Sequence, residues 1–356
     1  NGHMARAAQL LEAARERVSN VRWLIESASF AARGHDLQAA LRLWEQVLEA
    51  TPHNSHAVQQ KAALLAKLKG PRTALEYVGA LIDATPNWLD LYQVWMEWAD
   101  HADPKTQEAL LRRLLSLHPS NAWAQRQLAQ VLIQLGDAAG AAAIAQDAVR
   151  ADPNNPRAYE TLGDIERRSD HREHAQQAYR RAIELSADSS YSIEKLVATG
   201  ANSEERRTLL RFIKNELLRQ ITHGEGVAGY YSSARAVLDR VALGAELEGA
   251  WRERPDLWQT WSVWAEHLAE SGDFDAARQR IDEALDRFPL VPRLWLDKAH
   301  IFELQGDGER EQEALTHALQ LAPHWSLTLR RLADSWERSG RYDRSRDLLH
   351  AAVLHD

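Results

Sequence analysis

Residues 121–153 read NAWAQRQLAQVLIQLGDAAGAAAIAQDAVRADP, and this stretch decides the fold. Apolar and small residues recur every three to four positions on both sides of Gly136 and Asp137, which is the spacing of amphipathic helices. The glycine supplies a backbone conformation that is costly for other residues, and Pro153 ends the second helix. The stretch therefore predicts two antiparallel helices joined by a tight turn.

The same pattern returns at intervals of 34 residues. The spacing is kept by one set of glycines and two sets of alanines: Gly272, Gly306 and Gly340; Ala265, Ala299 and Ala333; Ala284, Ala318 and Ala352. Residues 155–187 carry further matches at Tyr159, Leu162, Gly163, Ala175, Tyr179 and Ala182. In period and signature the chain resembles the tetratricopeptide repeat (TPR) family over most of its length. The resemblance implies an all-α fold, a right-handed α-solenoid of helix-turn-helix repeats.

About eight repeats are clear, and a divergent segment separates two groups of them. The clear repeats cover residues 21–52, 54–86, 88–119, 121–153, 155–187, 258–289, 292–323 and 326–356. The divergent segment, residues 188–257, is expected to form two degenerate helical pairs. It holds a charged helix from Ser203 to about Thr222, a glycine-rich break at 224–229, and a helix through 234–241. The predicted domains are an N-terminal TPR block at 5–187, the divergent segment at 188–257, and a C-terminal TPR block at 258–356.

Both ends of the sequence carry expectations of their own. Residues 1–4 read NGHM, which is typical of a remnant left by cloning. At the other end, the 17-residue step from Gly272 to Pro289 predicts a proline at position 357 of the last repeat. The sequence stops at Asp356 on an apolar helix, whereas solenoids end in a polar cap. We therefore expect the native polypeptide to continue.

Composition restricts the classes of function. Hydrophobic residues make up 45% of the chain and charged residues 26%, which fits a folded protein, and no apolar run is long enough for a membrane span. The absence of cysteine excludes disulfides, thiolate zinc sites and cysteine nucleophiles. A net charge of -8 argues against nucleic-acid binding through phosphate contacts. The compartment stays open, with the cytoplasm favoured.

Thirteen tryptophans are many for a chain of this length. Most are expected in the core between repeats, because each buried indole removes roughly 150–250 Å² from water. Trp88, Trp258 and Trp325 precede the signature positions and are candidates for exposed anchors of a ligand. The aromatic doublets also resemble half-a-TPR repeats, which occur in RNA-processing scaffolds.

In TPR proteins the first helix of each pair lines a concave groove, and the resemblance places ten polar residues of this chain there. They are Arg126, Gln130, Asp164, Arg167 and Arg168 in the first half and Glu266, Glu270, His300, Arg330 and Asp334 in the second. The second set is more acidic, which would suit a basic or mixed-charge peptide. The competing interpretation is that these residues are only solvated helix faces. The Lys and Asn clamp of chaperone-tail receptors and the asparagine ladder of O-GlcNAc transferase are both missing.

Two short motifs lack the surrounding residues or elements that their function requires. Gly224, Gly226 and Gly229 match the dinucleotide fingerprint G-x-G-x-x-G, but a predicted helix precedes them where the fingerprint requires a strand. His171 and His174 have metal-compatible spacing, yet the sequence gives no further fixed ligand. We therefore predict no catalytic residue, no cofactor and no metal.

The sequence favours a non-catalytic scaffold that binds a protein or peptide in its groove. The first alternative is the recognition or regulatory domain of a larger enzyme, such as a peptidase or a glycosyl, sulfo or hydroxyl transferase, with its catalytic domain beyond residue 356. A scaffold for RNA processing is a minor alternative. The partner and the oligomeric state cannot be inferred from the sequence.

Overall fold

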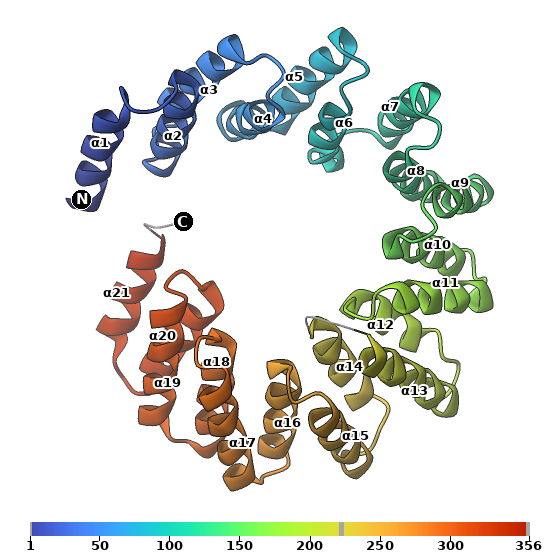
Figure 1. Cartoon of the computed structure of the whole chain (residues 1–356), viewed down its shortest axis with the longest axis vertical. Coiled ribbons are helices and arrows are strands. Elements are labelled where there is room, and N and C mark those ends of the chain that lie inside the picture. Colours follow the sequence, from blue (N-terminus) through green and yellow to red (C-terminus); the bar gives the residue numbers. More distant parts are fainter. Residues whose placement is uncertain (1, 221–223, 354–356) are drawn as a thin grey trace. The chain divides into compact units, whose positions relative to one another are not determined.

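A computed structural model describes residues 2–220 and 224–353, and within them every regular element is a helix (Figure 1). Contacts divide the chain into an N-terminal body, Asn1–Pro153, and a C-terminal body, Asn154–Asp356. The prediction of an all-α repeat fold is confirmed. No helix in the described part of the chain combines the length and apolar character that a membrane crossing requires.

The N-terminal body is a succession of helical pairs preceded by one further helix. Its elements are α1 (Gly2–Ala14), α2 (Asn20–Arg33), α3 (Leu37–Ala50), α4 (Ser55–Lys69), α5 (Pro71–Ala84), α6 (Leu89–Met96), the 3-10 helix η1 (Ala99–His101), α7 (Pro104–Leu117), α8 (Ala122–Gln134) and α9 (Ala138–Ala151). The third pair is irregular, because its first helix stops at Met96 and continues as η1. The Gln107 amide holds this break by donating to the carbonyls of Ala99 and Ala102.

The C-terminal body continues the pairing through the divergent segment. Its elements are α10 (Pro156–Arg168), α11 (Arg172–Leu185), α12 (Ser190–Ala198), α13 (Ser203–Arg219), α14 (Glu225–Arg235), α15 (Arg240–Glu253), α16 (Trp258–Glu270), α17 (Phe274–Arg287), α18 (Pro292–Gln305), α19 (Gly308–Leu321), α20 (Ser326–Arg338) and α21 (Tyr342–Val353). All eight clear repeats predicted from the sequence are present as helical pairs in the two bodies.

The turn inside a repeat follows from two adjacent residues. Gly136 has a φ of 83°, a region that side chains with a Cβ rarely occupy. Asp137 follows and caps α9, because its carboxylate accepts a hydrogen bond from the backbone N–H of Gly140 at 2.8 Å. The same cap recurs at Asp36, Asp273 and Asp307. The glycine reverses the chain and the aspartate starts the next helix.

Small residues in the first helix let large residues of the second approach closely. Gly163 in α10 faces the ring of Tyr179 in α11, and a Cβ at Gly163 would lie 2.7 Å from that ring. Tyr179 is fully buried. Ala129 and Ala265, which take the place of Gly163 in other repeats, are fully buried as well. The predicted contact of small against large residues is thus the packing rule of the array.

The divergent segment shares one core with its neighbours in the C-terminal body. Buried residues of α11, among them Ile183, join Ile193 of α12, Ile213 of α13 and Leu247 of α15 in a cluster that reaches Val263 of α16. The two degenerate pairs expected over residues 188–257 are therefore packed into the repeat array and are not a separate module.

Two details predicted for this segment are corrected by the structure. The helix break predicted at 224–229 is confined to Gly224, which has a positive φ before α14, and α14 runs through Gly226 and Gly229. A Cβ at Gly226 would lie 2.1 Å from the carbonyl oxygen of Ala187, so this glycine permits close contact with the end of α11. The helix expected through 234–241 is interrupted, because α14 ends at Arg235 and Asp239 caps α15.

Candidate functional site

The first helices of the C-terminal repeats present the acidic residues predicted for the groove. Glu266 on α16 and His300 on α18 line one hollow of about 80 Å³ together with Arg293, Leu296, Asp297, Leu327 and Arg331. We call these seven residues the acidic hollow after Glu266 and Asp297, and the two guanidinium groups of Arg293 and Arg331 balance the charge of these carboxylates. Its lining comes from α16, α18 and α20, which are the first helices of three successive repeats.

Asp297 of the acidic hollow is held in place by a hydrogen bond and an ion pair. Its carboxylate accepts a hydrogen bond from the Ser262 hydroxyl at 2.6 Å and pairs with Arg293 at 2.7 Å. Asp297 is 8% exposed, and the neighbouring charge of Asp297 raises the pKa of Arg293. These two interactions satisfy the buried carboxylate of Asp297.

Glu266 differs from Asp297 because no hydrogen bond or ion pair holds it within the described part of the chain. Its side chain is only partly accessible. Burial raises the pKa of the Glu266 carboxyl, and the nearby Asp297 and Glu270 carboxylates raise it further. Arg293 and His300 act in the opposite direction without cancelling the shift. An added cation beside Glu266 would therefore be favourable.

Of the other residues predicted for the second half of the groove, only His300 lines this hollow. Glu270 pairs with Arg235 at 2.9 Å and accepts a hydrogen bond from the Tyr231 hydroxyl. His300 contacts Glu303 at 3.1 Å. Arg330 and Asp334 are exposed on α20 and do not line the hollow, whereas Arg331 does. Sequence reasoning missed Arg293, Asp297 and Arg331, which the repeat register alone did not single out.

One of the residues predicted on α10, Asp164, makes hydrogen bonds within the fold. Asp164 accepts hydrogen bonds from the hydroxyls of Tyr179 at 2.7 Å and Tyr191 at 2.8 Å. Arg167 and Arg168 are exposed, and Arg167 lines a basic hollow of about 300 Å³ with Arg172 and Lys195. Arg126 and Gln130 lie on α8 in the N-terminal body, where Gln130 is exposed.

The three tryptophans predicted as anchors are all partly exposed. Trp258 packs against the cluster around Trp261, and Trp325 packs against the cluster around Leu332. The ring of Trp88 lies 5.2 Å from that of His53. Among the other tryptophans, Trp44, Trp95 and Trp261 are buried in the core at no more than 7% exposure, whereas the remaining ones are partly exposed.

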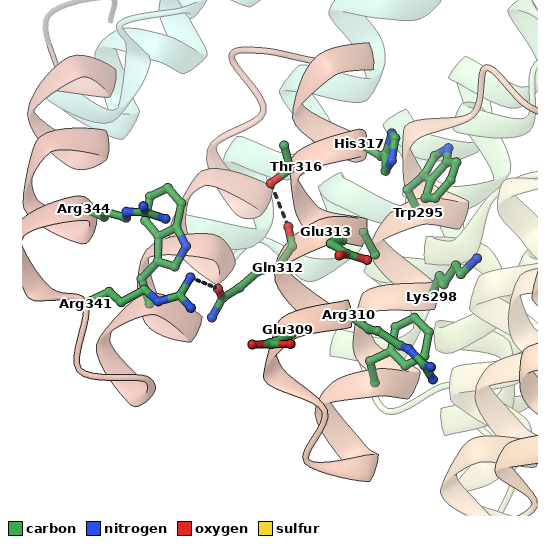
Figure 2. Close-up of a pocket in the computed structure, with 13 residues that line it drawn as sticks. Trp295, Lys298, Glu309, Arg310, Gln312, Glu313, Thr316, His317, Arg341 and Arg344 are labelled. Carbon is green, nitrogen blue, oxygen red and sulfur yellow. Dashed lines mark hydrogen bonds between the residues drawn. The ribbon is translucent and has the colours of Figure 1, made fainter.

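A second and larger hollow, of about 880 Å³, lies on the side of α19 (Figure 2). Trp295, Phe302 and Trp336 supply its aromatic surface, and Arg310, Arg341 and Arg344 supply positive charge. Arg341 donates a hydrogen bond to the Gln312 side chain at 3.0 Å. The sequence analysis did not predict this surface, whose residues come from the first helices α18 and α20 as well as from α19 and the start of α21.

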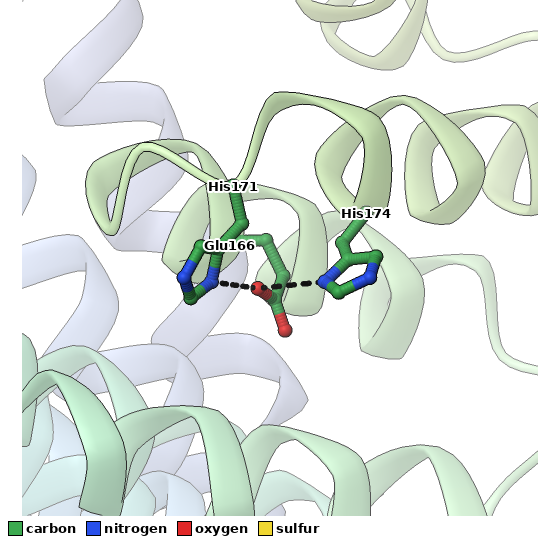
Figure 3. A group of neighbouring side chains, drawn as sticks. All are labelled: Glu166, His171 and His174. Carbon is green, nitrogen blue, oxygen red and sulfur yellow. Dashed lines mark hydrogen bonds and ion pairs between the residues drawn. The ribbon is translucent and has the colours of Figure 1, made fainter.

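A third group of side chains meets at the turn between α10 and α11 (Figure 3). Oε2 of Glu166 lies 2.8 Å from Nδ1 of His171 and 3.7 Å from Nδ1 of His174. The sequence had suggested His171 and His174 as ligand types without a partner. Glu166, which lies five residues before His171, is the residue that sequence reasoning missed.

Comparison with known proteins identifies repeats in both halves of the sequence. Three family models described as tetratricopeptide repeat match residues 103–165, 156–189 and 263–324. Comparison with curated proteins gives no match.

Similar solved structures include yeast Tom70, at 13% identity and a TM-score of 0.45, covering 100% of this chain and 89% of that one. They also include the MamA protein, at 19% identity and a TM-score of 0.37, covering 46% of this chain and 91% of that one. The family assignment rests on the three repeat matches together with the helix pairs, their glycine turns and their small-against-large packing. The chain carries tetratricopeptide repeats over residues 103–189 and 263–324.

Proposed function

We propose that this chain is a non-catalytic scaffold whose acidic hollow binds a basic side chain of a partner peptide or protein. Repeat arrays offer extended helical surfaces, and such surfaces recognise partners through a few anchoring contacts. The first helices of the C-terminal body supply the surface. The partner is a segment rich in lysine or arginine.

The observation that carries this proposal is the state of Glu266. Its carboxylate is half-buried and has no hydrogen bond or ion pair among the described residues. Burial and two nearby carboxylates raise its pKa more than Arg293 and His300 lower it. Removing an ionised carboxylate from water is costly unless a cation or a donor compensates it. A lysine or arginine entering the hollow would supply that compensation.

The size of the acidic hollow agrees with a single head group. Its volume of about 80 Å³ is far below the roughly 300–1,000 Å³ of pockets that enclose small-molecule ligands. Leu296 and Leu327 line it beside the charged residues and would contact the aliphatic stem of a lysine or arginine. The hollow is therefore suited to one side chain of a longer segment.

Fluorescence anisotropy with a short lysine- and arginine-rich peptide tests the proposal. The peptide is expected to bind the wild-type chain, and a counterpart with glutamates in place of the basic residues is not. Glu266→Gln should weaken binding at least about tenfold, which is the loss associated with roughly 1.4 kcal/mol.

Asp275→Asn is the matched control, because it removes one carboxylate from a second helix at a side chain that is 89% exposed. The control should bind the basic peptide as the wild type does. Equal weakening by Glu266→Gln and Asp275→Asn would show that net charge alone attracts the peptide, and this result would reject the acidic hollow as the site.

A further inference from the structure

Glu166 breaks the pattern of the repeat at a buried position. In each regular turn, the backbone N–H of the residue that starts the second helix donates to a carbonyl five residues earlier. In six repeats those carbonyls belong to Ala31, Leu132, Glu166, Leu268, Phe302 and Trp336. Five of these side chains are apolar, and the sixth is a carboxylate whose side chain is only 7% exposed. Glu166 is thus a buried acid at a position where the other five repeats have an apolar residue.

His171 breaks the pattern at the next step of the same turn. It occupies the N-cap position of α11, where Asp36, Asp137, Asp273 and Asp307 cap the equivalent helices with their carboxylates. The His171 side chain makes no cap hydrogen bond, and its Nδ1 lies 2.8 Å from Oε2 of Glu166. The helix gives up a stabilising cap and gains this contact.

His174, in the first turn of α11, is the third residue that differs from the pattern of the other repeats. The equivalent positions are held by Ala39, Gly140, Ala276 and Arg310, and each of those backbone N–H groups is bound by the aspartate cap. At His174 the side chain reaches back, so that its Nδ1 lies 3.7 Å from the same Glu166 oxygen. Three unusual residues therefore converge on one point (Figure 3).

The spacing of this cluster is compatible with a metal site. One ligand atom from each residue lies within 4.8 Å of the other two. In a tetrahedral zinc site with bonds of 2.0–2.2 Å, neighbouring ligand atoms are about 3.3 Å apart. The two distances from Glu166 bracket this value.

We propose that Glu166, His171 and His174 bind a divalent zinc ion through Oε2 and the two Nδ1 atoms. Two imidazoles and one carboxylate are a known zinc ligand set, and three protein ligands leave a fourth position for water. The imidazoles are 59% and 68% exposed at the side chain, so the ion enters directly from solvent. A ligating Nδ1 carries no proton, so the bound imidazoles are neutral with their proton on Nε2, and any protonated histidine releases one proton on binding.

Calorimetric titration of the chelator-treated full chain with zinc chloride tests this site. About one ion per chain is expected to bind, and cobalt is expected to give the visible absorption of a tetrahedral site. His174→Ala should weaken zinc binding at least about tenfold, since even the loss of an outer partner of a metal ligand costs that much. Glu166→Leu should do the same and should fold well, because leucine is the residue at the equivalent position Leu132.

The matched control is the double variant His53→Ala with His56→Ala. It removes two histidines at the same spacing, and these histidines belong to no metal-type group among the described residues. Zinc affinity should be unchanged in this control. The proposal is overturned if the wild-type chain binds no zinc, if Glu166→Leu and His174→Ala bind it as well as the wild type, or if the control loses as much affinity as they do.

Discussion

The hydroxyl of Tyr179 donates to Oδ1 of Asp164 at 2.7 Å and so ties the second helix of a repeat to its first helix. Tyr179 is fully buried, and burial together with the neighbouring Asp164 raises the pKa of its hydroxyl. The tyrosine therefore stays a neutral donor across the whole range of physiological pH. Asp164 also accepts from Tyr191, so this carboxylate is engaged within the C-terminal body.

Tyr179→Phe is expected to lower the free energy of unfolding by about 2 kcal/mol, because a buried hydrogen bond to a charged group is lost. Tyr191→Phe removes a hydroxyl from the same carboxylate, but Tyr191 is 44% exposed and water can replace it. Its cost should be below about 1 kcal/mol. Urea unfolding followed by circular dichroism measures both, and equal costs would contradict the assigned role of burial.

Gly163→Ala is expected to destabilise the chain by about 1–3 kcal/mol, because its new Cβ would lie 2.7 Å from the rigid ring of Tyr179. Gly249→Ala is the matched substitution within helix α15, where the Cβ would meet only the Lys214 amino group at 3.8 Å. It should stabilise the chain by about 0.5–1 kcal/mol through helix propensity. Thermal unfolding of the two variants should shift in opposite directions, and a shared direction would argue against close packing at Gly163.

His267 is expected to make the chain sensitive to mild acid. Burial lowers the pKa of His267, whose ring stacks on Trp264 with a centroid distance of 5.7 Å. Because the folded state disfavours the proton, the unfolded state binds it first as the pH falls below about 6.5. Stability should therefore decline from this pH down to the lowered pKa of the folded state.

Urea midpoints measured between neutral and mildly acidic pH check this sign for His267. The variant His267→Gln cannot titrate there, so its stability should fall less over the same range. Parallel curves for the wild type and the variant would assign the acid sensitivity to other histidines.

Glu266 has the opposite linkage because its pKa is raised. Between the ordinary pKa of a glutamate and the raised value, the folded state binds the proton more tightly, so stability is lost as the pH rises through this range. Glu266→Gln should therefore be more stable than the wild type at neutral pH, although it is expected to bind the basic peptide less well. Thermal unfolding at acidic and neutral pH should show the advantage of the variant only at the higher pH. A loss of stability at neutral pH would mean that Glu266 is already compensated within the fold.

The helical pairs could be predicted from the sequence because they depend on local spacing. The 34-residue period of Gly272, Gly306 and Gly340 reports turns, and each turn requires a positive φ that the structure has at all three. Gly226 and Gly229 were misinterpreted because a glycine also serves close contact. Only the tertiary approach of Ala187 and Ser190 distinguishes that use from a helix break.

The candidate sites were less predictable, since they depend on which face of each helix is covered. The register placed Glu266 and His300 on the first helices, and they share a hollow. It could not show that two tyrosines hold Asp164 or that Arg330 lies outside the hollow while Arg331 lines it. Glu166 could have been noticed as an acid at a position that is apolar in the other repeats, but its contact with two histidines requires the folded turn.

The most direct test of the proposed function is calorimetric titration of the basic peptide in two buffers that differ in ionisation enthalpy, at a mildly acidic pH. Because a bound cation favours the ionised form of Glu266, binding to the wild-type chain should release protons, and this release should be absent in Glu266→Gln. The same proton release in both proteins, or peptide binding of equal strength, would contradict the acidic hollow as the binding site.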